Sequence, residues 1–125
     1  MQTFGYFDTG KGPSGAETER FYHGFVLGLL VELNRKYTVT SNRESGFGRY
    51  DVMLEPKNRE ESAFILEFKV YDSDEEGNLL DTVASALQQI EEKQYEAALL
   101  AKGIPAENIH KYGFAFEGKN VLIGD

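Results

Sequence analysis

Hydrophobic and polar residues follow a helical period in the first part of the chain. Ser14 and Glu17 have the spacing of a capping box, which predicts a helix that starts there and ends near Lys36. Residues 2–15 are rich in glycine and are expected to form an irregular leading segment. The helix carries one apolar stripe with the spacing of a buried face, formed by Tyr22, Phe25, Val26, Leu29 and Leu33.

The middle of the chain has the composition and alternation of strands. Strands are expected at residues 37–40, 50–55 and 63–71, separated by polar turns at 41–48 and 56–61. The third of these strands is the most apolar. It is therefore expected at the centre of the sheet, where both faces of a strand are covered.

The last part of the chain predicts a long helix and a final hairpin. The helix begins at Leu79, breaks or bends near Lys93, and resumes through residues 100–103. Strands are expected at 109–116 and 121–124, joined by a tight turn. The helix has its own apolar stripe, formed by Leu79, Val83, Ala86, Leu87 and Ile90.

This order of helix, three strands, helix and two strands predicts a single α/β domain over residues 1–125, with a mixed sheet flanked by two helices. The length of 125 residues is enough for one core of ordinary size. Hydrophobic residues make up 41% of the chain, as in a globular protein. No repeat or internal linker divides the sequence.

Charged residues interrupt two adjacent strands. Asp51 lies in the strand at 50–55, and Glu67 and Lys69 lie in the apolar strand at 63–71. Because side chains alternate between the faces of a strand, Glu67 and Lys69 share one face. If the two strands pair as a hairpin, Asp51 comes close to Glu67.

Two neighbouring carboxylates repel each other and are costly to remove from water. Oxygen ligands from Asp51 and Glu67 suit a hard divalent cation, Mg²⁺ or Mn²⁺. Lys69 beside such a metal would hold or deprotonate a water, which is the apparatus for hydrolysing a phosphodiester. An alternative stays open, in which Glu67 and Lys69 form an ion pair at a sheet edge and Asp51 is an ordinary strand acid.

Composition and charge narrow these possibilities. The chain has no cysteine, which excludes disulfides and thiolate metal sites. Its formal net charge of -8 weighs against tight non-specific binding of nucleic acid, although a bound metal offsets acids locally. The longest apolar run, Phe25–Val31, is too short to span a bilayer, and no signal peptide is recognisable. We therefore expect no membrane association and a cytoplasmic location.

Two other segments begin like ligand-binding motifs. "GKGPSG" at residues 10–15 lacks the order of a P-loop. "DSDEEG" at residues 72–77 starts like a calcium-binding EF-hand loop, but its twelfth position is Val83 and not Glu. The acidic segment 72–78 is therefore expected to be a solvated loop.

The charged positions in the strands resemble the signature of the PD-(D/E)XK nuclease superfamily. That signature has an acid in the second core strand and Glu-x-Lys in the third, within an α-β-β-β-α-β order. Asp51, Glu67 and Lys69 match it in order and context, although Tyr50 replaces the leading proline. The chain is similar in particular to a branch of nuclease-like domains that follow an AAA-type ATPase domain in prokaryotic proteins. That likeness rests on "ERFYHGFVLGLL" (19–30), "SGFGRYDVMLEP" (45–56), "FILEFKV" (64–70), "ALQQIEEKQY" (86–95) and "YGFAFEGKNV" (112–121).

The resemblance implies a restriction-endonuclease-like fold and Mg²⁺-dependent (or Mn²⁺-dependent) hydrolysis of nucleic acid, with DNA expected before RNA. It implies that Asp51 and Glu67 bind the metal, that the backbone carbonyl of Phe68 adds an oxygen, and that Lys69 positions the attacking water. The ATPase domain is absent from these 125 residues. The chain is therefore either part of a longer protein or a free-standing relative, and an AAA-type ATPase is an expected partner.

Related nucleases also use acids and amides from their helices. Glu19, at the edge of the first apolar stripe, is a candidate third acid near the metal, against the alternative of a solvated or Arg-paired side chain. Gln89, Lys93 and Tyr95 are candidates for the substrate side, although polar edges are common on amphipathic helices. A rival function is a catalytically idle module that binds nucleic acid or regulates an associated ATPase.

Overall fold

The computed structural model describes residues 4–8, 15–43, 49–58 and 60–125, with side chains described for 21–41, 49–58 and 60–125. These residues form a six-stranded sheet in the order β1-β6-β5-β4-β3-β2. β4 and β5 are parallel, and the other neighbouring strands are antiparallel. The strands are β1 (Phe4–Asp8), β2 (Tyr37–Arg43), β3 (Arg49–Pro56), β4 (Ala63–Val70), β5 (Ile109–Glu117) and β6 (Asn120–Gly124). The helices are α1 (Gly15–Leu33), α2 (Leu79–Lys93), α3 (Tyr95–Ala101) and the short 3-10 helix η1 (Ala106–Asn108).

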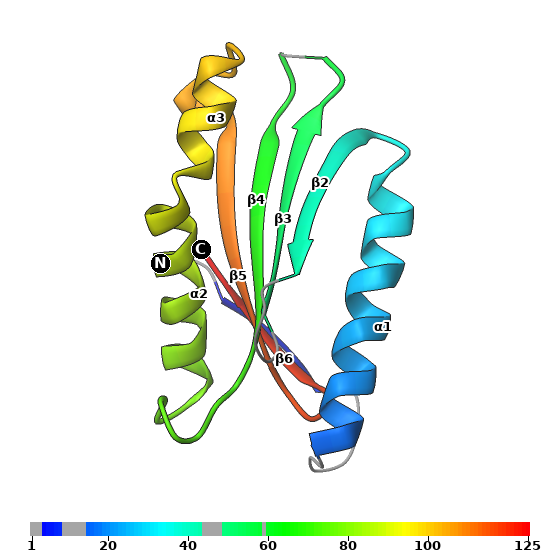
Figure 1. Cartoon of the computed structure of the whole chain (residues 1–125), viewed down its shortest axis with the longest axis vertical. Coiled ribbons are helices and arrows are strands. Elements are labelled where there is room, and N and C mark those ends of the chain that lie inside the picture. The colour runs from blue at the N-terminus through cyan, green and yellow to red at the C-terminus, as the bar shows by residue number, and fades with distance from the viewer. Residues whose placement is uncertain (1–3, 9–14, 44–48, 59) are drawn as a thin grey trace.

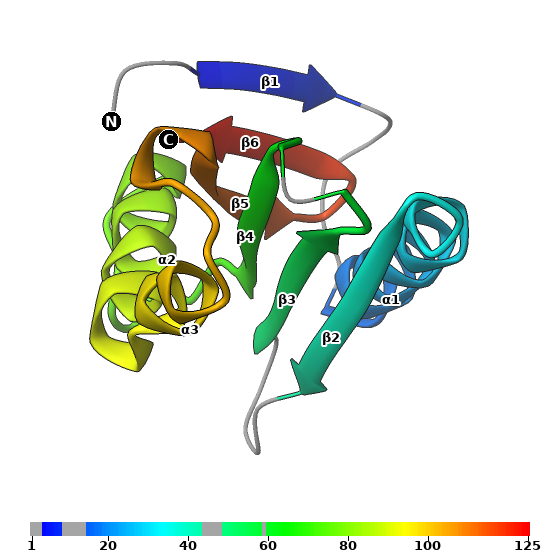
Figure 2. The same ribbon diagram turned by 90° about the horizontal axis from the view of Figure 1, so that it is seen from above.

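The helices cover opposite faces of the sheet. α1 lies on one face, and α2 with α3 lies on the other (Figures 1 and 2). The expected α/β architecture, a mixed sheet flanked by helices, is therefore confirmed. None of the helices in the described part of the chain has the length and apolarity needed to cross a membrane.

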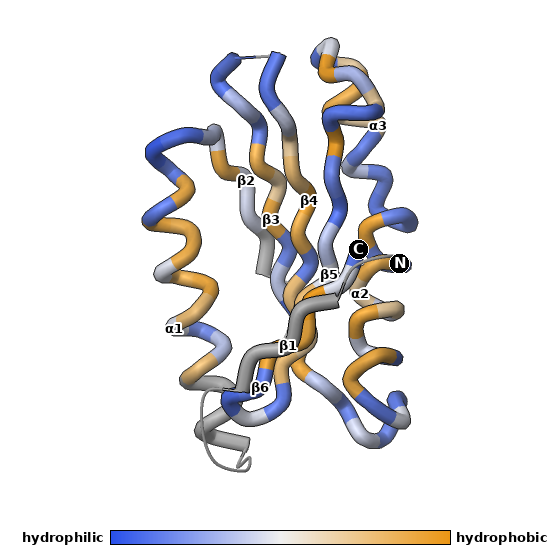
Figure 3. Tube along the Cα trace, turned by 180° about the vertical axis from the view of Figure 1, so that it is seen from behind, coloured by the Kyte–Doolittle hydropathy of each residue, from blue (hydrophilic) through white to orange (hydrophobic). Residues whose placement is uncertain are grey.

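The central strand β4 supplies both cores by the alternation of its side chains. Leu66 and Phe68 pack under α1 with Tyr22 and Phe116, whereas Ile65 belongs to the cluster that α2 and α3 cover. β4 lies between β5 and β3, as its apolar sequence predicted. Figure 3 shows hydrophobic stretches along β3 and β4 between the helical layers, and hydrophilic residues in the loop that joins these strands.

The break predicted near Lys93 is confirmed. α2 ends at Lys93, and Gln94 adopts the left-handed conformation with φ 56° before α3 begins at Tyr95. A residue in this conformation is a common end of an α-helix. α2 runs beside β4 and β5 and packs against them, and Lys93 stands in its last turn (Figure 1).

The leading segment differs from its prediction. Residues Phe4–Asp8 form β1, which pairs antiparallel with β6, rather than an irregular stretch. The segment "FGYFD" contains three aromatic residues, which favour strands, and the strand pairs an otherwise open edge of β6. β2 is also longer than predicted, since it continues to Arg43.

Candidate active site

Two carboxylates lie opposite each other on adjacent strands. β3 and β4 pair with Asp51 in register with Glu67. Asp51 is 2% exposed and Glu67 is 0% exposed. Cross-strand partners have Cβ atoms roughly 4.5–5.5 Å apart, so two like charges meet in a buried place. The sequence-based expectation that a hairpin brings these two acids together is confirmed.

The pair lies on the face that α2 covers. Met53 follows Asp51 by two residues on β3, and Ile65 precedes Glu67 by two residues on β4, so each shares a face with its acid. Both pack in the cluster beneath α2 and α3. Gly113 is the register partner of Glu67 on β5. A Cβ at Gly113 would lie 3.0 Å from the carbonyl oxygen of Val83. The missing side chain therefore lets α2 approach the sheet closely beside Glu67, which explains why this carboxylate is buried.

Lys93 brings a positive charge to both acids. Its Nζ donates a hydrogen bond to Oδ2 of Asp51 at 2.7 Å and lies 3.8 Å from Oε1 of Glu67. The Lys93 side chain is 21% exposed. We expected Lys93 on the substrate side. The structure places it against the carboxylates, from the last turn of α2 and across 42 residues of sequence.

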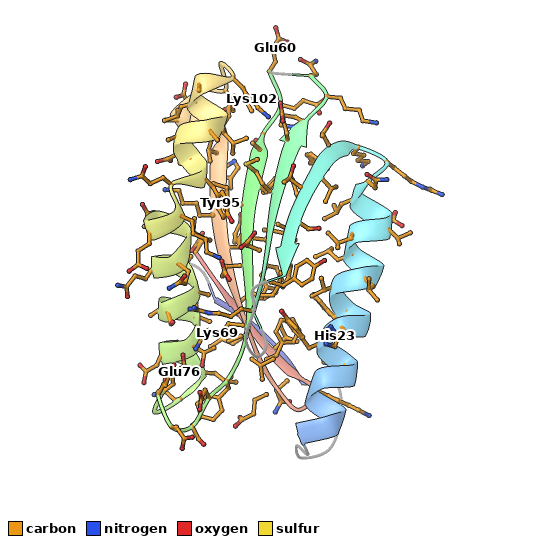
Figure 4. All side chains as sticks on the ribbon, viewed as in Figure 1. His23, Glu60, Lys69, Glu76, Tyr95 and Lys102 are labelled. Atoms are coloured by element: carbon orange, nitrogen blue, oxygen red, sulfur yellow. The ribbon has the colours of Figure 1, made fainter. Side chains whose placement is uncertain are left out.

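Lys69 has a different partner. Its Nζ forms a buried ion pair with Oε2 of Glu76, and the two side chains are 7% and 6% exposed. The alternative prediction placed an ion pair of Glu67 and Lys69 at a sheet edge. That location is wrong, because β4 is an internal strand. Figure 4 shows Lys69 and Glu76 near each other at the start of α2, between the helix and the sheet.

Glu76 corrects the expectation of a solvated acidic loop. It is 9% exposed, and it accepts hydrogen bonds from the Asp72 N–H at 2.9 Å and from Oγ1 of Thr82 at 3.0 Å. Burial raises the pKa of Glu76, but the hydrogen bonds from Lys69, Asp72 and Thr82 lower it by more, so its pKa lies below the ordinary value of 4.5. The remaining acids of the loop are exposed, as predicted: Asp72, Asp74 and Glu75.

Arg49 stands next to the carboxylate pair. It is in register with Lys69, one step further along the same face of the two strands. Its Nε is buried, and no hydrogen-bond partner for it exists among the residues that the structure describes. A pair of bases therefore lies beside a pair of acids. Like charges directly opposite each other in a sheet are destabilising, so the register of Arg49 with Lys69 is unfavourable to the fold.

The donor chemistry of the pair fits a divalent cation. Two carboxylates offer the oxygen ligands that Mg²⁺ and Mn²⁺ prefer. The ammonium of Lys93 already stands where a cation contacts Asp51 and comes near Glu67. In the described part of the chain, no group of three or more His, Asp or Glu side chains is arranged to hold a metal ion. Further protein ligands would therefore have to be backbone oxygens, amide or hydroxyl oxygens, or groups outside the described residues.

Two predicted metal ligands are not tested by this geometry. Phe68 lies between Glu67 and Lys69 with its side chain fully buried on the opposite face, and a role for its carbonyl stays a prediction. Glu19 belongs to α1, but its side chain lies outside the described residues. α1 packs on the face of the sheet opposite to the carboxylates (Figure 2).

The remaining polar side chains have these contacts among the described residues. Gln89 is half-buried, and its Nε2 donates to Oε2 of Glu92 on the same helix at 3.3 Å. Tyr95 packs beside the cluster beneath α2 and α3. The ring of His23 lies 5.3 Å from that of Tyr22 in a tilted arrangement on the α1 side, far from the loop of Glu76 in Figure 4. Among the candidates from α2 and α3, Lys93 has an established contact with the carboxylates.

Comparison with known proteins adds one match. A family model described as the PD-(D/E)XK nuclease superfamily matches residues 17–125. No curated protein and no solved structure matches the chain. The matched segment begins in the first turn of α1 and includes Asp51, Glu67 and Lys69, whereas β1 lies outside it. The mixed sheet and flanking helices are those of the restriction-endonuclease-like fold. The chain belongs to the PD-(D/E)XK nuclease superfamily.

Proposed function

We propose that this chain is a divalent-metal-dependent nuclease that hydrolyses phosphodiester bonds of nucleic acid, with DNA proposed before RNA. The observation that carries the proposal is the buried pair of Asp51 and Glu67, in register and beside a cationic group. A buried pair of like charges is costly to a fold unless a cation compensates it. Membership of a nuclease superfamily supports the same reading.

The proposed roles divide between the charged residues of β3 and β4. Asp51 and Glu67 hold the cation, and the carbonyl of Phe68 is proposed as a further oxygen donor. When bound, Mg²⁺ or Mn²⁺ polarises the phosphate and makes water more acidic. Lys69 orients the attacking water. Its ammonium is held by Glu76, which reduces the rotamer entropy that a free lysine would lose on ordering.

The remaining roles stay proposals from the family resemblance. Glu19 is a proposed further acid of the site, and Gln89 and Tyr95 are proposed contacts of the substrate strand. A substrate-side role of Lys93 is a proposal as well, and its Nζ contacts Asp51. A cytoplasmic location and an association with an AAA-type ATPase are likewise proposed.

A second candidate function is a catalytically idle module that binds nucleic acid or regulates an ATPase. One observation favours it: Lys93 contacts Asp51, and Glu76 engages Lys69, so the charged groups compensate one another without metal. In such a module Lys93 stays in contact with the carboxylates. In a metal-dependent nuclease, a metal ion would have to take its place there. The two functions therefore differ in whether Mn²⁺ binds the carboxylates and whether cleavage follows.

Lys69→Ala distinguishes the two functions. Lys69 shares its face with Glu67 and does not belong to the apolar clusters, so its truncation should leave the core in place, although the lost ion pair with Glu76 lowers stability. Cleavage of single-stranded DNA, double-stranded DNA and RNA is measured with Mn²⁺. We expect the wild-type chain to cleave at least one of them and Lys69→Ala to lose about 10²–10⁴ in rate. Mn²⁺ binding, measured by calorimetry, should persist in this variant and disappear in Asp51→Asn.

The matched control is Lys102→Ala. Lys102 also pairs with a glutamate, Glu55, at 2.7 Å, but this pair is exposed and lies at the other end of β3. Its removal should leave cleavage unchanged. Equal cleavage by the wild-type chain and Lys69→Ala would contradict the assigned mechanism. Absence of cleavage in the wild-type chain, with Mn²⁺ bound or not, would favour the idle module.

A further inference from the structure

Arg49 costs the folded chain stability in two ways. It stands in register opposite Lys69, a residue of the same charge. Like charges at directly opposed positions of a sheet are destabilising. Its Nε is buried and has no hydrogen-bond partner among the residues that the structure describes, and a buried donor without a partner is itself unfavourable. Packing within the described fold therefore gives no reason for an arginine at this position.

An anionic group held at Arg49 would relieve these costs. It would separate the guanidinium from the Lys69 ammonium by a negative charge, and Nε would gain an acceptor once the half-buried side chain turned toward it. Arginine binds phosphate well because its planar donors match two phosphate oxygens at once. The other base of the pair is already engaged, since Lys69 contacts Glu76. Among the residues that the structure describes, Arg49 is therefore the base at this end of the site without an ion-pair partner.

The location of Arg49 specifies which phosphate it meets. Arg49 and Asp51 lie on the same face of β3, two residues apart, which is about 6.6 Å along a strand. A phosphate on Arg49 therefore lies next to the carboxylate pair and beside Lys69. We propose that Arg49 is a substrate-binding residue that contacts the nucleic acid backbone at a phosphate adjacent to Asp51 and Glu67. The inference rests on the proposed nuclease function and adds a named contact to it.

The first test measures binding rather than cleavage. A fluorescent single-stranded oligonucleotide is titrated with protein in Ca²⁺ at several salt concentrations, and the integrity of the probe is checked on a gel. In Arg49→Gln we expect binding weaker by about tenfold or more, as for a lost hydrogen bond to a charged group. The slope of log affinity against log salt should fall by about one, because one phosphate contact is lost.

The matched control is Arg35→Gln, which makes the same chemical change at an exposed position after α1. It removes the same charge from the whole molecule, so it reports the effect of net charge alone. We expect its affinity and salt slope to stay near those of the wild-type chain. Arg49→Lys keeps the charge but loses the two-point geometry, so it should bind more weakly with an unchanged salt slope. This second variant tests the contact if Arg49→Gln does not fold.

Thermal unfolding distinguishes a substrate-binding role of Arg49 from a structural one, because the two roles predict opposite changes in melting temperature. Because Arg49 opposes Lys69, Arg49→Gln should melt at the same temperature as the wild-type chain or higher. A lower melting temperature together with unchanged binding would make Arg49 a structural residue and would overturn the inference. Equal affinity and slope in Arg49→Gln and the wild-type chain would also overturn it, as would a wild-type chain that does not bind the probe.

The outcome is separable from that of the proposed function. If the wild-type chain cleaves nucleic acid and Arg49→Gln binds and cleaves equally well, the inference about Arg49 fails and the nuclease function stands. If Arg49→Gln loses affinity and salt slope but the wild-type chain cleaves nothing, the contact stands and the nuclease function fails.

Discussion

At the scale of single residues, the site is a set of buried charges that compensate one another. Asp51 and Glu67 meet Lys93, and Lys69 meets Glu76. The positions of Asp51 and Glu67 could be predicted from the sequence, because strand alternation and a hairpin are local rules. Glu76 could not, since nothing in the acidic run distinguishes it from its exposed neighbours until the loop folds back onto Lys69.

The ion pair between Lys69 and Glu76 should make stability depend on pH. The pKa of Glu76 is lowered in the folded chain from 4.5, so the ionised form is the one that folding stabilises. Its contribution is therefore fully present above about pH 4.5 and is lost as the pH falls through the lower pKa of the folded state. Glu76→Gln should reduce the free energy of unfolding at pH 7 by about 1.5–3 kcal/mol, as for a hydrogen bond to a charged group.

The measurement is chemical denaturation of the wild-type chain and Glu76→Gln from pH 7 down to pH 3. The difference in the free energy of unfolding should be constant above pH 5 and should shrink below pH 4.5. Glu75→Gln, at the exposed neighbouring acid, is the control for loss of one negative charge. A difference that grew as the pH fell would mean that Glu76 is protonated in the folded chain.

At the scale of elements, α2 assembles the site from distant parts of the sequence. Its first turn supplies Thr82 to Glu76, and its last residue, Lys93, reaches Asp51. The sequence predicted the helix and its break, because hydrophobic period and local backbone preference are visible in a short window. It did not predict the contact of Lys93, which depends on how closely α2 approaches the sheet over Gly113. β1 was missed because its glycine and aromatic residues form a strand only once β6 provides a partner.

Lys93 should act as an internal cation that competes with metal. Removing its charge in Lys93→Met leaves Asp51 and Glu67 facing each other, and breaking a buried ion pair typically costs about 3–5 kcal/mol. Because the Lys93 side chain is 21% exposed, we expect a smaller loss of about 1–3 kcal/mol. Without the competing ammonium, Mn²⁺ should bind more tightly than to the wild-type chain.

Thermal unfolding in EDTA and calorimetric titration with Mn²⁺ measure both effects. Lys102→Met is the control, since it removes a lysine from an exposed pair with Glu55. It should change neither the affinity for Mn²⁺ nor, by more than a few tenths of a kcal/mol, the stability. Weaker Mn²⁺ binding in Lys93→Met would mean that Lys93 supports the metal site and does not compete with it.

At the scale of the whole molecule, the net charge of -8 opposes the binding of a polyanion, so the proposed function depends on local charge. The fold class and the central position of β4 followed from the order of elements and from the apolar sequence of that strand. The compensation of charges within the site could not be predicted in this way. It depends on the pairs Lys69–Glu76 and Lys93–Asp51, whose members are 7 and 42 residues apart in sequence. A bound divalent cation would make the site less negative and the surroundings of Arg49 and Lys69 more favourable to phosphate.

A divalent cation should therefore stabilise the whole chain by mass action. A ligand that binds only the folded state contributes about 2.7 kcal/mol when its concentration is one hundred times Kd. For a chain of this length, that corresponds to a rise in melting temperature of roughly 10 °C. We expect this rise with Mg²⁺ or Mn²⁺ in thermal unfolding of the wild-type chain.

Divalent cations also screen the repulsion within an acidic protein, so a rise in melting temperature alone does not locate the site. Glu67→Gln separates the two effects, because it retains almost all of the negative charge and loses one carboxylate of the pair. Its melting temperature should respond to Mg²⁺ no more than to a sodium salt at equal ionic strength. If Glu67→Gln responds to Mg²⁺ as strongly as the wild-type chain does, the stabilisation arises elsewhere on the acidic surface. The pair of Asp51 and Glu67 would then be held by Lys93 alone, as the idle module requires.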